Sequence, residues 1–177
     1  MQDPFDTLGL EPRFALDLAQ AEERHRTLSR TLHPDRNAGR PPAERRLALG
    51  RAIEVNSAWR ALRDPIARAE CLLARAGVLV GEGNEPRPPA SLLMEMMEAR
   101  EALTVARSHR DAIALEKLAS AMRTRESALL EGLARAFDEA AGDRVILAQR
   151  ALEDLGTLRY VRRFFAEVEA IEEELAS

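Results

Sequence analysis

The tripeptide His33-Pro34-Asp35 places an imidazole and a carboxylate on either side of a rigid proline. These two groups are frequent partners in acid-base catalysis, but catalysis also needs a reacting group, a means of stabilising developing charge and a pocket that excludes water. The surrounding sequence offers no nucleophile, and the chain has no glycine-rich phosphate loop, no H-E-x-x-H and no G-x-S-x-G motif. The pattern therefore favours recognition over catalysis, because proline presents the two polar side chains to a partner at low entropic cost.

Four arginines surround this tripeptide: Arg24, Arg26, Arg30 and Arg36. Guanidinium groups pair bidentately with carboxylates and steer charged partners over long distances, so the set favours docking on an acidic protein surface. For any single arginine the sequence leaves an alternative open. Glu22 and Glu23 lie in the same stretch, and an ion pair at i,i+3 or i,i+4 on a solvated helix face would use an arginine equally well.

A second group of side chains lies in a predicted helix over residues 90–106. Five apolar residues follow helical spacing and suit the interior of a bundle: Leu92, Met96, Ala99, Leu103 and Ala106. Leu93, Met94 and Met97 lie beside that stripe, together with Glu98 and Glu101. Either the core-facing surface is wide and methionine fills it, or the extra residues bind another protein, to which methionine adapts and carboxylates give orientation.

The elements that position the tripeptide are two long predicted helices, one capped by Asp17 and running to about residue 32, the other over residues 43–62. Facing each other, they form a hairpin with the tripeptide at its tip. The expected inward residues are Leu18, Ala21, His25, Leu28 and Leu32 in the first helix, and Leu47, Ala52, Val55, Trp59 and Leu62 in the second. Asp64-Pro65 begins a shorter helix over residues 66–76, closed by Gly77.

Glycine and proline between residues 81 and 89 indicate a linker, which we place at residues 78–90 between domains at 1–77 and 91–177. The second domain contains no proline beyond the linker, and helical patterns cover residues 90–106, 109–137 and 143–175. In the last of these, Leu158, Val161, Phe165 and Val168 suit the core, with Tyr160 and Phe164 at its flank. The predicted fold class is all-α, a helical hairpin followed by a three-helix bundle.

Composition limits the kinds of partner. The net charge is −4; residues 1–78 carry 13 basic and 11 acidic side chains, whereas residues 79–177 carry 13 and 19. This balance argues against nucleic-acid binding and suggests different partners for the two halves. One cysteine permits no intrachain disulfide, and no signal peptide or long apolar run is evident, so we expect a cytoplasmic chain without membrane partners.

Several segments together resemble the J-domain of DnaJ-class co-chaperones. They are Phe5-Asp6-Thr7-Leu8-Gly9-Leu10, the tripeptide, the run from Ile53 to Leu62, and Asp64-Pro65-Ile66-Ala67-Arg68-Ala69. Leu32 and Arg36 stand where the family commonly has tyrosine and lysine, and both keep the apolar or cationic character. The resemblance implies that His33, Pro34 and Asp35 trigger ATP hydrolysis by a DnaK-class chaperone, while the arginines dock on it.

The order of a J-domain, a linker and the helix from Leu92 to Glu101 resembles the HscB family, J-type co-chaperones of iron–sulfur cluster biogenesis, in its bacterial form without a zinc-binding cysteine extension. That resemblance implies a non-enzymatic protein without cofactor or metal, whose partners are an HscA/DnaK-class ATPase and an IscU-like scaffold. By position, the scaffold-binding residues are Leu93, Met94, Met97, Glu98, Glu101 and Tyr160. Two alternatives are a general J-domain adaptor for another client and an enzyme with a buried site between helices.

Overall fold

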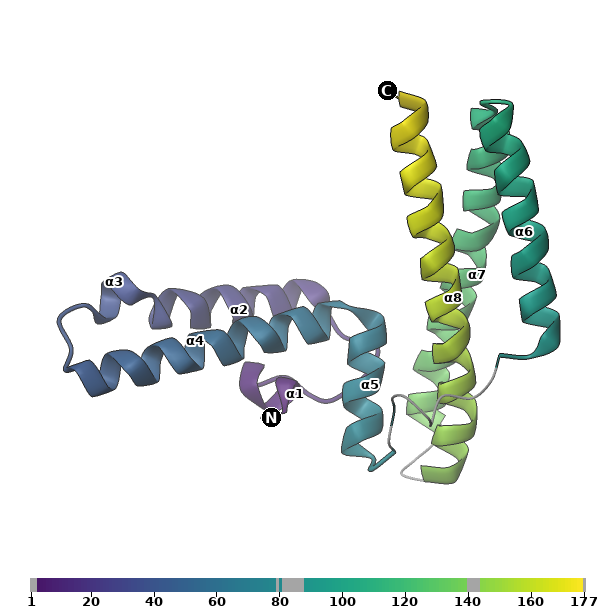
Figure 1. The fold of residues 1–177 in the computed structure, drawn as a ribbon. Helices are drawn as coiled ribbons and strands as arrows, with labels where there is room; N and C mark the ends of the chain where they lie inside the picture. The colour runs from purple at the N-terminus through teal and green to yellow at the C-terminus, as the bar shows by residue number, and fades with distance from the viewer. Residues whose placement is uncertain (1–2, 79, 81–87, 140–143, 177) are drawn as a thin grey trace. The chain divides into compact units, whose positions relative to one another are not determined.

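The computed structural model describes residues 3–78, 80, 88–139 and 144–176, and the chain divides into two compact units, Met1–Val78 and Leu79–Ser177. Helices are the regular elements throughout the described residues (Figure 1). The predicted all-α class, with a helical hairpin in the first unit and a three-helix bundle in the second, is confirmed. Most of the predicted linker at 78–90 lies outside the described residues.

The first unit opens with two capped helices, α1 (Pro4–Leu8) and α2 (Leu18–Leu32). The Asp3 carboxylate accepts hydrogen bonds from the backbone N–H groups of the first turn of α1, and Gly9 ends that helix with φ of 64°, a left-handed conformation that favours glycine. The Asp17 side chain accepts from the backbone N–H of Gln20, as the sequence predicted. These caps satisfy N–H groups that a helix start leaves without partners.

Helix α2 and α4 (Pro42–Arg63) run antiparallel, side by side, with the short α3 (Pro34–Asn37) at the end of the pair (Figure 1). Ala21, Val55 and Leu62 are buried in this unit. His25 stacks on Trp59 with ring centroids 5.5 Å apart, and its Nε2 hydrogen-bonds Asn56 Oδ1 at 2.9 Å. The imidazole is a packing residue of the hairpin.

Two predicted inward residues of the hairpin are exposed. Leu18 lies in the first turn of α2, and Leu47 on α4 has 59% of its surface accessible. Helix α1 covers the side of α4 that carries Ala58 and Ala61, which lies further along α4 than Leu47 (Figure 1). Leu47 has the correct spacing for a stripe, but the described residues leave its face of this turn uncovered.

The corner between α4 and α5 (Pro65–Arg75) depends on one buried arginine. Asp64 caps α5 by accepting from the backbone N–H of Ala67, and Pro65 begins the helix, as predicted. Arg68 is only 7% exposed; its Nη1 donates to the carbonyl of Leu62 at 2.7 Å, and its guanidinium lies 5.0 Å from the centre of the Phe14 ring. Burial lowers the pKa of Arg68, with Asp64 opposing, yet the group stays charged.

The second unit consists of α6 (Ala90–Ser108), α7 (Ala112–Glu139) and α8 (Arg144–Ala176), packed together in one bundle (Figure 1). Arg110 takes a left-handed conformation between α6 and α7, and the Asp111 carboxylate caps α7 by accepting from the N–H groups of Ile113 and Ala114. Side chains from all three helices form one apolar core: Leu92, Met96, Ala99, Leu103, Leu115, Ala119, Met122, Val161, Phe164, Val168 and Ile171.

The assignment of the two phenylalanines of α8 was wrong. Phe164, expected at the flank, is 1% exposed within the core, whereas Phe165, expected inside, is half-buried and packs against its edge. Measured from Val161, both positions fit a helical stripe, three and four residues on. The packing of α6 and α7 against α8 decides between them, and sequence spacing does not contain that information.

No described helix has both the length and the apolar character that a membrane span requires.

The two phenylalanines give a matched test of the bundle. Phe164→Ala should lower the free energy of unfolding of the second unit by about 3–5 kcal/mol, and Phe165→Ala by about half of that, because only the first leaves an enclosed cavity. Urea denaturation followed by far-ultraviolet circular dichroism measures both. Trp59 is the single tryptophan and lies in the first unit, so its fluorescence midpoint serves as the internal control. Equal losses for the two variants would contradict the assignment.

Candidate functional site

The tripeptide predicted as a trigger forms an exposed, ordered tip. His33 is the residue before α3, and Pro34 opens that helix with the φ that proline already has. His33 Nδ1 accepts a hydrogen bond from the backbone N–H of Asp35 at 3.2 Å and lies 3.6 Å from Asp35 Oδ2. The other ring nitrogen, Nε2, bonds to no described residue. The tip therefore offers a partner one imidazole nitrogen, on His33, and one exposed carboxylate, on Asp35.

Asn37, a residue that the sequence analysis did not single out, stabilises the tip. Its side chain is 6% exposed, and Nδ2 donates to the carbonyls of His33 at 2.9 Å and Thr31 at 3.3 Å. These bonds tie α3 to the last turn of α2, whose carbonyls would otherwise lack partners. An asparagine three residues after a proline that ends a helix was the available signal, because its amide reaches back to free carbonyls.

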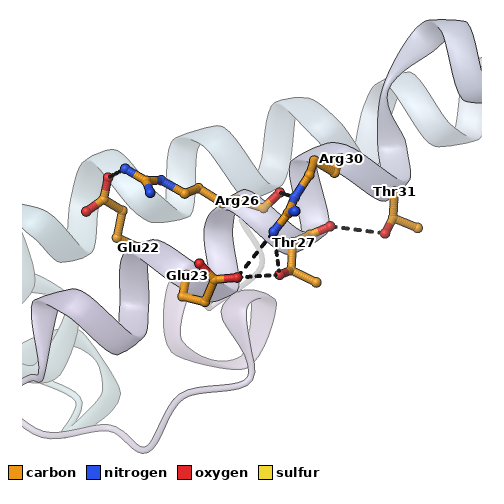
Figure 2. Close-up of polar contacts among 6 residues, drawn as sticks. All are labelled: Glu22, Glu23, Arg26, Thr27, Arg30 and Thr31. Atoms are coloured by element: carbon orange, nitrogen blue, oxygen red, sulfur yellow. Dashed lines mark hydrogen bonds and ion pairs between the residues drawn. The ribbon is translucent and has the colours of Figure 1, made fainter.

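Arg26 and Arg30 lie one turn apart on α2 and are both held by acidic neighbours. Figure 2 shows the two pairs: Arg26 Nη2 to Glu22 Oε1 at 2.6 Å, and Arg30 Nη2 to Glu23 Oε1 at 3.2 Å. The i,i+4 alternative is thus realised for Arg26. Both arginine side chains are more than 60% exposed, and such surface pairs contribute about 0–1 kcal/mol, so a partner carboxylate can replace the intrahelical one at little cost.

The arginines of α2 do not form a single row. Arg24 lies two positions before Arg26, which places it about 160° around the helix from that residue. Arg24 is exposed, and no acidic side chain among the described residues pairs with it. Arg36 is exposed on α3, beside the tripeptide. Arg26 and Arg30 thus share one face of α2, with Arg24 on its other flank.

Helix α6 has two apolar faces, of which only one is buried. The predicted core stripe of Leu92, Met96, Ala99, Leu103 and Ala106 is buried at every position. Leu93, Met94 and Met97 are 41%, 63% and 64% exposed, and Glu98 and Glu101 are exposed beside them. At about 100° per residue these five residues lie opposite the stripe. The alternative in which the methionines widen the core is therefore wrong.

Tyr160, the sixth predicted residue of this site, is half-buried on α8 against the core, with the Arg163 guanidinium 5.4 Å from its ring centre. It approaches α6 at Arg100. Hydrogen bonds with Glu167 raise the pKa of Arg100, and the charges of Glu167 and Tyr160 add to this effect, while partial burial opposes it. Tyr160 thus packs at the edge of the bundle core, and Arg100, whose charge it influences, is one turn from Met97.

Arg100 is a second residue whose part in the site was missed. Its Nε and Nη2 bond the Glu167 carboxylate at 2.6–3.0 Å, and seven residues further along α6 and α8 the Arg107 Nη2 bonds Glu174 Oε2 at 2.5 Å. On the α7 side, Glu95 pairs with Arg125. The sequence signal for these pairs was that Arg100 and Arg107 have the same seven-residue spacing as Glu167 and Glu174. A seven-residue step returns to nearly the same face of a helix, so two such pairs can form side by side.

Burial raises the pKa of two acidic groups among the described residues, the Asp154 carboxyl and the Cys71 thiol. At Asp154 the charge of Glu153 adds to this effect and that of Arg135 opposes it, and the side chain lies against Gly132 of α7. Burial, followed by the charges of Asp3 and Glu70, likewise raises the pKa of the Cys71 thiol and makes it a poorer nucleophile.

Comparisons with known proteins agree with this geometry. A family model described as the HSCB C-terminal oligomerisation domain matches residues 88–174. The co-chaperone protein HscB homologues of Burkholderia vietnamiensis and Burkholderia multivorans are 35% and 36% identical over 171 residues, 97% of this chain and 94% of each relative. Chaperone HscB from Vibrio cholerae has a similar structure, with a TM-score of 0.85 at 26% identity over 98% of this chain and 99% of that one. Since these similarities extend over nearly the whole sequence, the chain belongs to the HscB family of co-chaperones.

Proposed function

We propose that this protein is a cytoplasmic co-chaperone of iron–sulfur cluster assembly that presents a scaffold protein to an ATPase chaperone. The first unit stimulates ATP hydrolysis by a chaperone of the HscA or DnaK class, and the second unit binds an IscU-like scaffold. Membership of the HscB family supports the overall role. The observation that carries the proposal is the exposure of Leu93, Met94 and Met97 on the helix that buries a separate core stripe.

The scaffold surface follows from that exposure. Three large apolar side chains exposed on one helix face are unfavourable in water. They are 41–64% exposed, so burying the rest of each against a partner contributes about 1–2 kcal/mol. Glu98 and Glu101 flank them and favour a scaffold with basic or N–H donor groups beside an apolar patch. The Arg100–Glu167 pair joins α6 to α8 beside this surface and Tyr160 packs against the bundle core, which supports a surface that is formed before the scaffold arrives.

The trigger rests on the tip. His33, Pro34 and Asp35 are exposed, while the buried Asn37 fixes the backbone that carries them. Arg24, Arg26, Arg30 and Arg36 add the positive charge with which the first unit approaches an acidic surface of the ATPase. No nucleotide site is required on this chain, because the contact acts on the hydrolysis that the ATPase performs.

One chain that carries both surfaces couples the two partners. A scaffold bound to the second unit is held at a high effective concentration near the ATPase that the first unit engages. Hydrolysis then traps the scaffold on the chaperone and promotes release of its cluster, which is cargo of the scaffold.

His33→Gln should abolish the trigger and spare the scaffold surface. We expect stimulation of single-turnover ATP hydrolysis by an HscA-class chaperone to fall about tenfold or more, the effect of losing about 1.4 kcal/mol of interaction. Affinity for IscU should stay at the parent value. If the variant stimulates as well as the parent, the tripeptide is only a turn. If the parent itself fails with HscA, the same assay with DnaK distinguishes a wrong ATPase from a wrong function.

Asn37→Ala should also weaken stimulation, by about fivefold, because two hydrogen bonds of about 0.5–1.5 kcal/mol each no longer hold the tip. Asn37→Asp is the matched control: it keeps the size of the side chain but cannot donate to the two carbonyls, so it should be equally defective. Stimulation by Asn37→Asp at the parent level would show that packing, and not donation, positions the tip. The thermal midpoint of each variant is measured alongside.

Replacing Leu93 and Met97 together by alanine should lower the affinity for IscU by about tenfold or more, since central apolar contacts dominate an interface. Val105→Ala is the control, because Val105 is 56% exposed on the same helix but outside this surface. Isothermal titration calorimetry measures both, with helicity checked by circular dichroism. Unchanged affinity of the double variant would place the scaffold elsewhere. A parent chain that does not bind IscU would favour a general adaptor for another client.

A further inference from the structure

Helix α4 exposes three large apolar side chains that the proposed function does not use: Leu47, Leu49 and Ile53, each 55–59% accessible. Leu49 and Ile53 lie one turn apart, and each lines a hollow in the surface of the first unit. Leu47 lines neither hollow. A solvated helix face seldom gathers aliphatic residues beside concave apolar surface, so this face is a candidate for contact with another molecule.

The first hollow, of about 470 Å³, lies at the tip of the hairpin. Leu49 and Pro42 from α4 line it together with Pro34 and Asp35 of the tripeptide and Ala38. It therefore shares two residues with the trigger. A molecule that contacts the tripeptide reaches this hollow without crossing other surface.

The second hollow, of about 600 Å³, lies among α1, α4 and α5. Ile53 and Ala61 line it from α4, Pro4 from α1, and Cys71 and Ala74 from α5. Leu49, Ile53, Ser57 and Ala61 follow an i,i+4 row that extends over about 18 Å and joins the two hollows. We call this row with its two hollows the α4 groove.

Charge is distributed unevenly along the α4 groove. Arg45 and Arg46 line the tip hollow, both are exposed, and neither pairs with an acidic side chain among the described residues. At the other end Arg75 is neutralised by Asp3 at 2.5 Å and Asp6 at 3.2 Å. Glu54 also lines this second hollow, so carboxylates outnumber the single arginine there. The groove is thus basic near the tripeptide and weakly acidic further along.

We propose that the α4 groove binds a segment of the ATPase chaperone that carries apolar side chains next to acidic residues, with the acidic residues at the Arg45 and Arg46 end. This inference rests on the proposed function for the identity of the partner. The positive charge selects carboxylates, the hollows accept aliphatic side chains, and continuity with the tripeptide places the segment on the same partner. The groove supplies affinity, while His33 and Asp35 supply the trigger.

The decisive variant is Leu49→Ser with Ile53→Ser in the full chain, and Leu47→Ser is its control, since all three leucine or isoleucine side chains are equally exposed on one helix. In single-turnover hydrolysis the double variant should raise the half-saturating concentration of co-chaperone about fivefold or more and leave maximal stimulation unchanged. Leu47→Ser should match the parent. Arg46→Glu, a second and independent variant, should raise the half-saturating concentration and flatten its dependence on salt.

Cys71 offers a direct measure of occupancy, because it is the only cysteine of the chain and lines the second hollow. Its alkylation by N-ethylmaleimide, followed by mass spectrometry of the parent protein, should slow several-fold when the ATPase chaperone and ATP are added. Alkylation at an unchanged rate would overturn the extension of the contact to the second hollow.

The outcomes separate this inference from the proposed function. If His33→Gln abolishes stimulation while the double serine variant behaves as the parent does, the groove proposal is wrong and the trigger stands. If the parent stimulates neither HscA nor DnaK, both are wrong. Binding of the parent, and not of the double variant, to vesicles with 30% anionic lipid would make the groove a membrane site. If the double variant has a smaller mass than the parent in analytical ultracentrifugation, the groove is a self-association site. Vesicle binding or self-association through the groove would each overturn the proposal.

Discussion

The rotation of each helix about its own axis is fixed by the stripe that it buries, and every proposed contact depends on that constraint. In α6, burial of Leu92, Met96, Ala99, Leu103 and Ala106 sets which residues face water, and Leu93, Met94 and Met97 have no other place. A rotation of one residue, about 100°, would bury Leu93 and Met97 and expose core positions, at a cost of several side-chain burials of roughly 1.5–3 kcal/mol each. The scaffold surface is therefore as well defined as the core behind it.

In the hairpin the helices bury less apolar surface, so hydrogen bonds also help to fix their positions. Ala21 is the one residue of α2 that is fully enclosed, so α2 depends on α4 through the stacked His25 and Trp59 and on caps at its two ends. At the tip, α3 has only four residues and cannot be stable as an isolated helix. Hydrogen bonds from the Asn37 side chain and from the backbone N–H of Asp35 stabilise α3 instead, and they hold the exposed tripeptide in one conformation.

Local signals in the sequence predicted the fold well, and long-range packing explains what they missed. Asp17 was recognised as a cap and Pro65 as the start of a helix, because both signals depend on neighbouring residues alone. The α6 stripe was predicted in full because its helix packs on a broad surface. Leu47 was wrongly predicted to be buried because its burial depends on which part of α4 the neighbouring helices cover. Phe164 was wrongly predicted at the flank because its burial depends on how α6 packs against α8. Local sequence spacing predicts neither. Asn37 and Arg100 escaped notice because each acts through partners on another element. The roles of the predicted site residues remain proposals that geometry supports.

The energetics of the proposed contacts differ between the charged and the apolar surfaces. Arg26 and Arg30 are already paired within α2, so exchanging Glu22 or Glu23 for a partner carboxylate replaces one weak surface pair by another and yields speed and orientation more than affinity. Apolar contacts on α4 and α6 have no such competitor in the free protein, so in the proposed complexes affinity would come chiefly from them. The charged tip would then engage and disengage within the lifetime of the apolar contacts. Such a division would let one chain hold a scaffold while it triggers hydrolysis in a transient encounter.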